Sequence, residues 1–90
     1  MPRVGQARKR DWNERGVIQA LQDIGVTVVS LSGVGLPDLL AWSPHDGFRL
    51  IEVKQPRGHL TPRQKEMREK VPFVIVRSAE QALALYGVRA

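Results

Sequence analysis

The sequence contains no cysteine, only two histidines and no long run of apolar residues. Without cysteine the chain forms no disulfide and no thiolate zinc site, and His45 and His59 are too isolated to form a histidine cluster. No apolar stretch approaches the roughly 20 residues that a membrane-spanning helix needs. The first residues also lack the apolar core of a signal peptide. We therefore expect an intracellular, cytoplasmic protein that is not held in a membrane.

Acidic residues are scarce relative to basic ones. The 90 residues include 14 Lys and Arg against 9 Asp and Glu, which gives a net charge of +5 at pH 7. On one small domain this excess predicts an anionic partner, most simply nucleic acid, although solubility alone is the alternative explanation. Hydrophobic residues make up 42% of the chain, which is too high for a disordered protein. We expect one globular domain without repeats or linkers.

The chain opens with a basic segment. Residues 1–10 contain no acid, and their basic residues include Arg8, Lys9 and Arg10. We expect a flexible arm, or a frayed lead into a helix, that contacts nucleic-acid phosphates. A simply disordered terminus is the alternative for its first half. The folded domain is then predicted to span residues 11–90.

A helical pattern follows over residues 11–24. Its apolar residues recur at helical spacing: Val17, Ala20, Leu21 and Ile24. Asp11 suits the N-cap position, and Glu14 stands three residues later, which is the spacing of a capping box. Glu14 also lies at the edge of the apolar stripe that faces the sheet, so a place in a functional site is the alternative. Gly25 is expected to end the helix.

The remaining pattern indicates an α/β domain. Short runs of apolar and β-branched residues predict strands over 26–31 and 72–76. Thr61 and Pro62 mark the start of a helix over 62–70, in which Gln64 has the capping-box spacing, and a last short helix covers 78–86. Together with a central hairpin, these segments give the order αβββαβα and a mixed sheet.

The hairpin is the centre of the sequence. Two apolar runs flank the turn sequence Ser43-Pro44-His45-Asp46-Gly47. If the strands pair symmetrically about His45, Asp38 lies opposite Glu52, with Cβ atoms roughly 4.5–5.5 Å apart. Because strand side chains alternate, seven residues then share one face. They are Asp38, Leu40, Trp42, Phe48, Leu50, Glu52 and Lys54.

Two opposed carboxylates are destabilising at that spacing and require an explanation. A hard cation such as Mg²⁺ could lie between them, one carboxylate could remain protonated, or the register could differ by one residue and abolish the pair. Lys54 follows Glu52 by about 6.6 Å on the same face. It could form a plain structural salt bridge with Glu52, so the hairpin alone leaves a metal site and a salt bridge open.

Three segments in this order resemble a known nuclease family. They are Gly35-Leu36-Pro37-Asp38, Glu52-Val53-Lys54 and Leu60-Thr61-Pro62-Arg63-Gln64. The pattern resembles the PD-(D/E)XK nuclease superfamily and, within it, the short stand-alone form of the virus-type replication-repair nuclease (VRR-NUC) domain. The segment Asp11-Trp12-Asn13-Glu14 is similar to the first helix of that family. The resemblance extends over nearly the whole chain and implies a restriction-endonuclease-like PD-(D/E)XK core.

The resemblance implies a metal-dependent active site. Asp38, Glu52 and the backbone carbonyl of Val53 would bind Mg²⁺ or Mn²⁺, and Lys54 would orient the attacking water and stabilise negative charge. Gln64 and Glu14 would complete the catalytic set, either behind the metal ligands or in contact with the metal-bound water or the substrate. Basic residues next to this site would contact the DNA backbone. They are Arg57, Arg63 and Lys65, together with the N-terminal Arg8, Lys9 and Arg10.

The function implied is that of a structure-selective DNA endonuclease that cuts branched DNA, such as four-way (Holliday) junctions. A nucleoid-associated or phage-encoded setting would fit the family. A non-catalytic nucleic-acid-binding module that retains the nuclease fold is the main alternative, and an RNA nuclease is a third. We also expect a homodimer, because a small core gains from an interface and a four-way junction is roughly two-fold symmetric. Trp12, Trp42, Phe73 and Tyr86 are candidates for that interface, although the core is the favoured place for each.

Overall fold

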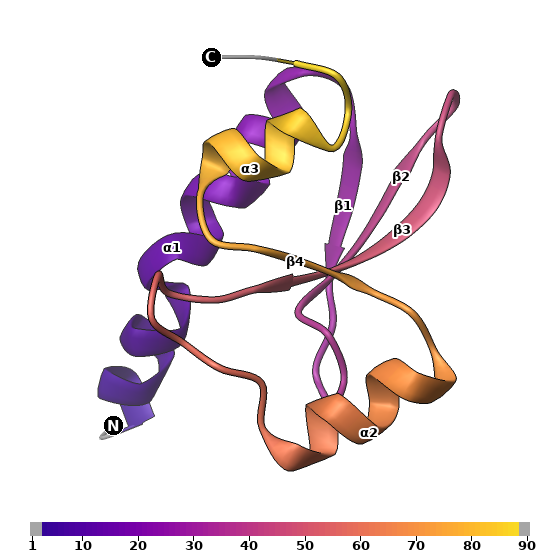
Figure 1. Ribbon diagram of the computed structural model, residues 1–90. Helices are drawn as coiled ribbons and strands as arrows, with labels where there is room; N and C mark the ends of the chain where they lie inside the picture. The colour runs from indigo at the N-terminus through magenta and orange to yellow at the C-terminus, as the bar shows by residue number, and fades with distance from the viewer. Residues whose placement is uncertain (1–2, 89–90) are drawn as a thin grey trace.

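The computed structural model describes the backbone of residues 3–88 and the side chains of residues 13–88. Seven elements follow one another in the predicted order αβββαβα (Figure 1). They are α1 (Arg3–Asp23), β1 (Thr27–Ser30), β2 (Leu39–Ser43), β3 (Gly47–Val53), α2 (Pro62–Lys70), β4 (Val74–Val76) and α3 (Ala79–Ala84). The predicted α/β class is confirmed, and α2 has the predicted bounds.

The four strands form one mixed sheet in the order β1-β2-β3-β4. The first two pairings are antiparallel, and β3 pairs with β4 in parallel. Within the hairpin, Leu40 lies opposite Leu50 and Trp42 lies opposite Phe48. The predicted register is therefore confirmed, and its continuation by two residues places Asp38 opposite Glu52.

Helices α1 and α3 pack together on one face of the sheet (Figure 1). The core lies beneath them and includes Leu21 of α1, Leu39 of β2 and Ile51 of β3, all with no exposed surface. Helix α2 lies apart from these layers and contributes no buried side chain. The sheet face that carries Trp42 and Phe48 is consequently left open, with these two side chains 40% and 73% exposed.

Helix α1 begins at Arg3, eight residues before the predicted start. The expected N-cap at Asp11 is wrong, because Asp11 lies inside the helix, and the capping-box explanation of Glu14 is wrong with it. Residues 3–10 contain several good helix formers, so the helix continues through the segment predicted to be an arm. The side chains of Arg8, Lys9, Arg10 and Trp12 lie outside the described residues.

The C-terminal end of α1 follows the prediction more closely. Gly25 has a φ of +88°, the left-handed conformation that glycine adopts at no steric cost. Its N–H donates to the carbonyl of Gln22, and the N–H of Val26 donates to that of Leu21, which together form a Schellman motif. Ile24 follows the last helical residue and is 40% exposed rather than buried as expected. Among the described helices, none is both long and apolar enough to cross a bilayer.

Candidate active site

The hairpin brings two carboxylates together where β2 begins and β3 ends. Glu52 lies within β3 and is only 2% exposed. Asp38 directly precedes β2, and its Oδ2 atom accepts a hydrogen bond of 2.9 Å from the backbone N–H of Val53. This bond fixes the Asp38 carboxylate against the strand that carries Glu52. The cross-strand pair predicted from the turn is therefore present.

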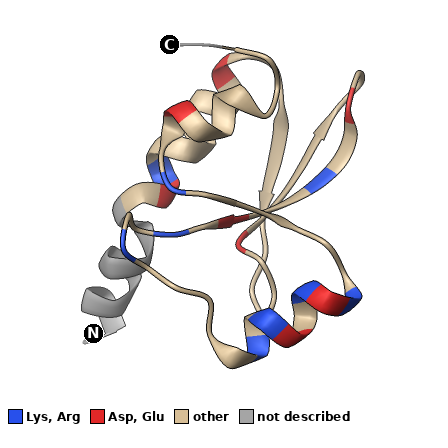
Figure 2. Ribbon diagram, viewed as in Figure 1, with Lys and Arg blue, Asp and Glu red and all other residues tan. Residues whose placement is uncertain are grey.

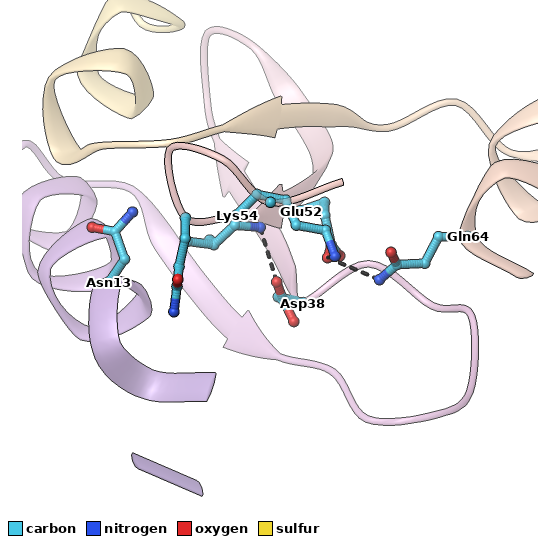
Figure 3. Close-up of a pocket in the computed structure, with 8 residues that line it drawn as sticks. Asn13, Asp38, Glu52, Lys54 and Gln64 are labelled. Atoms are coloured by element: carbon cyan, nitrogen blue, oxygen red, sulfur yellow. Dashed lines mark hydrogen bonds and ion pairs between the residues drawn. The ribbon is translucent and has the colours of Figure 1, made fainter. Parts of the chain in front are cut away.

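The two oxygens of Glu52 have different surroundings (Figure 3). Its Oε2 atom accepts a hydrogen bond of 2.9 Å from Nε2 of Gln64 and lies 3.3 Å from Nζ of Lys54. Its Oε1 atom is buried and has no hydrogen-bond partner. Burial raises the pKa of Glu52 above its ordinary value, and the nearby Asp38 carboxylate raises it further, while Lys54 and Gln64 act in the opposite direction. The ionised carboxylate thus lacks full compensation from the protein.

Gln64 serves two purposes at once. Its Oε1 atom accepts a hydrogen bond from the N–H of Thr61, and its own N–H donates to the Thr61 hydroxyl. This is the complete capping box that begins α2. Its Nε2 atom meanwhile donates to Glu52. Capping of α2 and contact with the carboxylate cluster are therefore compatible, because the two ends of one amide bind Thr61 and Glu52 at the same time.

Lys54 follows β3 directly and has a side chain that is 17% exposed. Its backbone N–H donates to the carbonyl of Val76, which continues the parallel pairing of β3 and β4. Its ammonium group forms the ion pair with Glu52 that the sequence allowed. The salt bridge and the carboxylate pair are therefore parts of one cluster.

The cluster lines a cleft to which α1, β3 and α2 contribute side chains (Figure 3). The lining residues are Asn13, Asp38, Glu52, Val53, Lys54, Gln55, Gly58 and Gln64. No role is predicted for Asn13 or Gln55, although Asn13 lies in the segment that resembles the family's first helix and Gln55 directly follows Lys54. Glu14 is predicted to touch the metal-bound water or the substrate, or to lie behind the residues that do. It is buried next to Asn13 in α1, at 5% exposure, and does not line the cleft, so only the second of these places remains a prediction.

Basic residues gather on α2 and on the loop between β3 and α2 (Figure 2). The side chains of Arg57, Arg63 and Lys65 are exposed there, as predicted for residues that contact a nucleic acid. Arg68 differs from these residues, because its Nε atom donates to the carbonyl of Phe73 and its guanidinium lies over the Phe73 ring. Arg68 therefore holds α2 to the chain segment that precedes β4.

The donor set of the cleft fits a hard divalent cation. Residues 13–88 contain no group of three or more His, Cys, Asp or Glu side chains suited to a metal, so a site here would combine two carboxylates with backbone and water oxygens. Mg²⁺ binds in this manner, through one or two carboxylates. The unpartnered Oε1 atom of Glu52 is the observation that favours a cation, since a buried oxygen without a partner is costly.

The comparisons with known proteins agree with this geometry. The sequence model of the VRR-NUC domain family matches residues 9–72. A solved structure described as a VRR_NUC domain is similar with a TM-score of 0.67 and 25% sequence identity, over 88% of this chain and 95% of that one. No curated protein sequence matches the chain. The matched residues include the whole carboxylate cluster, and the chain therefore belongs to the VRR-NUC domain family.

Proposed function

We propose that the protein is a Mg²⁺- or Mn²⁺-dependent DNA endonuclease that hydrolyses phosphodiester bonds. The observation that carries this proposal is the buried, unpartnered Oε1 atom of Glu52 opposite the carboxylate of Asp38. Such a pair is destabilising unless a cation or a proton compensates it. A fold retained only for binding would have no need of this arrangement.

The cation would be held by Asp38, Glu52 and the carbonyl oxygen of Val53. When bound, a divalent ion lowers the pKa of a coordinated water and stabilises charge on a phosphoryl oxygen. The ammonium of Lys54 is suited to orient the attacking water and to stabilise negative charge near the phosphate. Gln64 orients the Glu52 carboxylate through its hydrogen bond. Glu14, buried beside the cleft, would support the site from α1.

The proposed substrate is branched DNA, with four-way junctions as the first candidate. Arg57, Arg63 and Lys65 lie exposed on the segment that follows the active-site strand, so a phosphate backbone could run along them into the cleft. The N-terminal Arg8, Lys9 and Arg10 would extend the same contact. A non-catalytic DNA-binding module with this fold is the second candidate, since the exposed basic residues suit either function.

Cleavage of a substrate panel tests the proposal directly. Duplex, flap, four-way junction and RNA substrates of equal length would each be incubated with Mg²⁺, with Mn²⁺ and with EDTA. We expect nicking of junction DNA with either metal and none in EDTA, because the carboxylates alone supply no activated water. Binding without cleavage under every metal condition would favour the non-catalytic module, and preferential cleavage of RNA would reassign the substrate.

We also propose that the protein acts as a homodimer through the open face of the sheet. Trp42 and Phe48 lie side by side on that face, with ring centroids 6.5 Å apart, and Val29 of β1 is 50% exposed. Adjacent exposed apolar residues of this kind are typical of an interaction surface. Of the other candidates, Phe73 is buried at 4% exposure and Tyr86 packs against the core, so both are assigned to the protein interior.

The change Phe48→Asp should convert the dimer to a monomer, because it places a charge at the centre of the proposed interface. Light scattering at micromolar concentration should give twice the chain mass for the wild type and the chain mass for the variant. Val34→Asp is the matched control, since Val34 is also highly exposed, at 75%, but lies in the loop before Asp38. A monomeric wild type, both alone and with junction DNA, would contradict the dimer without affecting the nuclease proposal.

A further inference from the structure

One guanidinium group donates hydrogen bonds to three backbone carbonyls beside the proposed active site. Arg77 directly follows β4, and its Nη1 atom donates to the carbonyl oxygens of Gln55 at 2.8 Å, Gly58 at 2.8 Å and Pro56 at 3.4 Å. All three carbonyls belong to the loop that follows Lys54. Neither the proposed metal site nor the proposed DNA contacts give Arg77 a role.

The carbonyls belong to a tight turn that is closed by a hydrogen bond of 2.9 Å from the N–H of Gly58 to the carbonyl of Gln55. Turns of this kind at the surface gain little from their own single bond. Here the positive charge of Arg77 faces the carbonyl dipoles, and hydrogen bonds from charged donors are the stronger ones. Arg77 therefore holds the turn in one place relative to β4.

The turn from Gln55 to Gly58 also lies against the side chain of Lys54. A Cβ atom added at Gly58 would lie 3.5 Å from Cδ of Lys54 and 3.3 Å from the carbonyl oxygen of Gln55. Gly58 therefore lies next to the aliphatic part of Lys54, with room between them for little more than one methyl group, and both residues line the cleft. The Lys54 ammonium lies 3.3 Å from Oε2 of Glu52. A displacement of the turn would remove one wall of the space that the Lys54 side chain occupies.

The backbone of Arg77 is itself held by hydrogen bonds to residues of two helices, α1 and α3. Nδ2 of Asn13, in α1, donates to the carbonyl of Arg77 at 2.9 Å. The N–H of Arg77 donates to Oε1 of Gln81, in α3, at 2.6 Å. These two contacts hold the backbone of Arg77 in place, and its side chain extends from there to the turn.

We propose that Arg77 is a positioning residue that holds the Lys54 ammonium at the carboxylate cluster by means of the turn from Gln55 to Gly58. The role in turnover rests on the proposed nuclease function, whereas the effect on Lys54 does not. Because the Arg77 guanidinium donates to carbonyls of the chain itself, it acts on the reaction through Lys54 and not through contact with DNA. A misplacement of about 1 Å at a catalytic group can lower a rate by about 10²-fold.

Chemical labelling of Lys54 tests the proposal without cleavage. The rate of reductive methylation of Lys54 would be measured by peptide mass spectrometry relative to the exposed Lys70 of the same molecule. We expect faster labelling of Lys54 in Arg77→Ala, because the ammonium leaves Glu52, and partial restoration in Arg77→Lys, whose ammonium can still donate to carbonyls. Gly58→Ala disturbs the same turn, because its Cβ would lie 3.3 Å from the carbonyl oxygen of Gln55. It should increase the labelling of Lys54 to a smaller extent and covers the case in which Arg77→Ala does not fold.

The matched control is Arg49→Ala, which also removes a guanidinium that donates to a backbone carbonyl, that of Leu85, but does not line the cleft. Its Lys54 should be labelled at the wild-type rate. Unchanged labelling of Lys54 in folded Arg77→Ala, or an equal increase in Arg49→Ala, would overturn the proposal.

Measurements of kcat and KM test whether the displacement of Lys54 in Arg77→Ala also slows cleavage. On the preferred substrate, Arg77→Ala should lower kcat by about 10-fold or more with little change in KM, in accordance with a displaced Lys54. A rise in KM with unchanged kcat would instead make Arg77 a substrate contact and overturn the positioning role. If the wild type cleaves nothing, the nuclease proposal fails, and the labelling result still decides whether Arg77 positions Lys54.

Discussion

Asp38→Asn and Glu52→Gln should each abolish cleavage while DNA binding persists or becomes tighter. Each change removes one of the two carboxylates that would hold the cation, and it also removes a negative charge that repels phosphate. Cleavage would be measured on the substrate cut by the wild type, and binding on the same DNA in EDTA. Glu80→Gln is the control, because it neutralises an exposed carboxylate of α3 that does not line the cleft. Metal-dependent cleavage retained by either cluster variant would refute the assignment.

Glu52→Gln also tests how the charge of Glu52 affects the stability of the fold. Because burial and Asp38 raise the pKa of Glu52, the folded protein binds this proton more tightly than the unfolded chain does. Without metal, wild-type stability should therefore fall as the pH rises from below the unfolded-chain pKa of Glu52 through the raised pKa of the folded state. Glu52→Gln escapes that loss and should melt higher at neutral pH, with the difference shrinking in acid. Melting curves in EDTA that differ by the same amount at every pH would contradict this explanation.

Lys54→Ala should lower kcat by about 10²-fold or more, which is the range observed when one donor to a developing oxyanion is removed. Metal affinity should change far less than in the carboxylate variants, because an ammonium group is not a metal ligand. Single-turnover cleavage and calorimetric titration with Mn²⁺ would measure the two quantities. If Lys54→Ala merely melts lower, and the folded fraction cuts at the wild-type rate, Lys54 forms only a structural salt bridge with Glu52.

Local signals in the sequence were sufficient for the elements around the cleft. The turn residues between Ser43 and Gly47 set the register of the hairpin, and that register alone places Asp38 opposite Glu52. The pair Thr61 and Pro62 marks the beginning of α2, because one residue caps the helix and the other suits its first position. In these places the backbone preference and the side-chain pattern agree, so little depended on distant contacts.

The features that sequence reasoning missed depend on contacts between distant segments. Asn13 contacts the far end of the chain through its amide, which donates to the carbonyl of Arg77, 64 residues away. Arg77 itself has the appearance of any surface arginine, and only the folded chain brings the carbonyls after β3 to it. The early start of α1 has a different cause, since good helix formers continue the helix past a residue that resembles an N-cap.

Helix α2 contributes no buried side chain to the core, so it should detach from the cleft more easily than the other elements. Its attachments are polar and few: the amide of Gln64 on Glu52, and the guanidinium of Arg68 on the carbonyl of Phe73. Separation of the helix exposes almost no apolar surface, so its opening free energy lies well below that of global unfolding. On warming, we therefore expect the cleft to lose Gln64 while α1, α3 and the sheet remain folded. Loss of the proposed activity should then precede denaturation, and a melting temperature would overstate the range over which the cleft is intact.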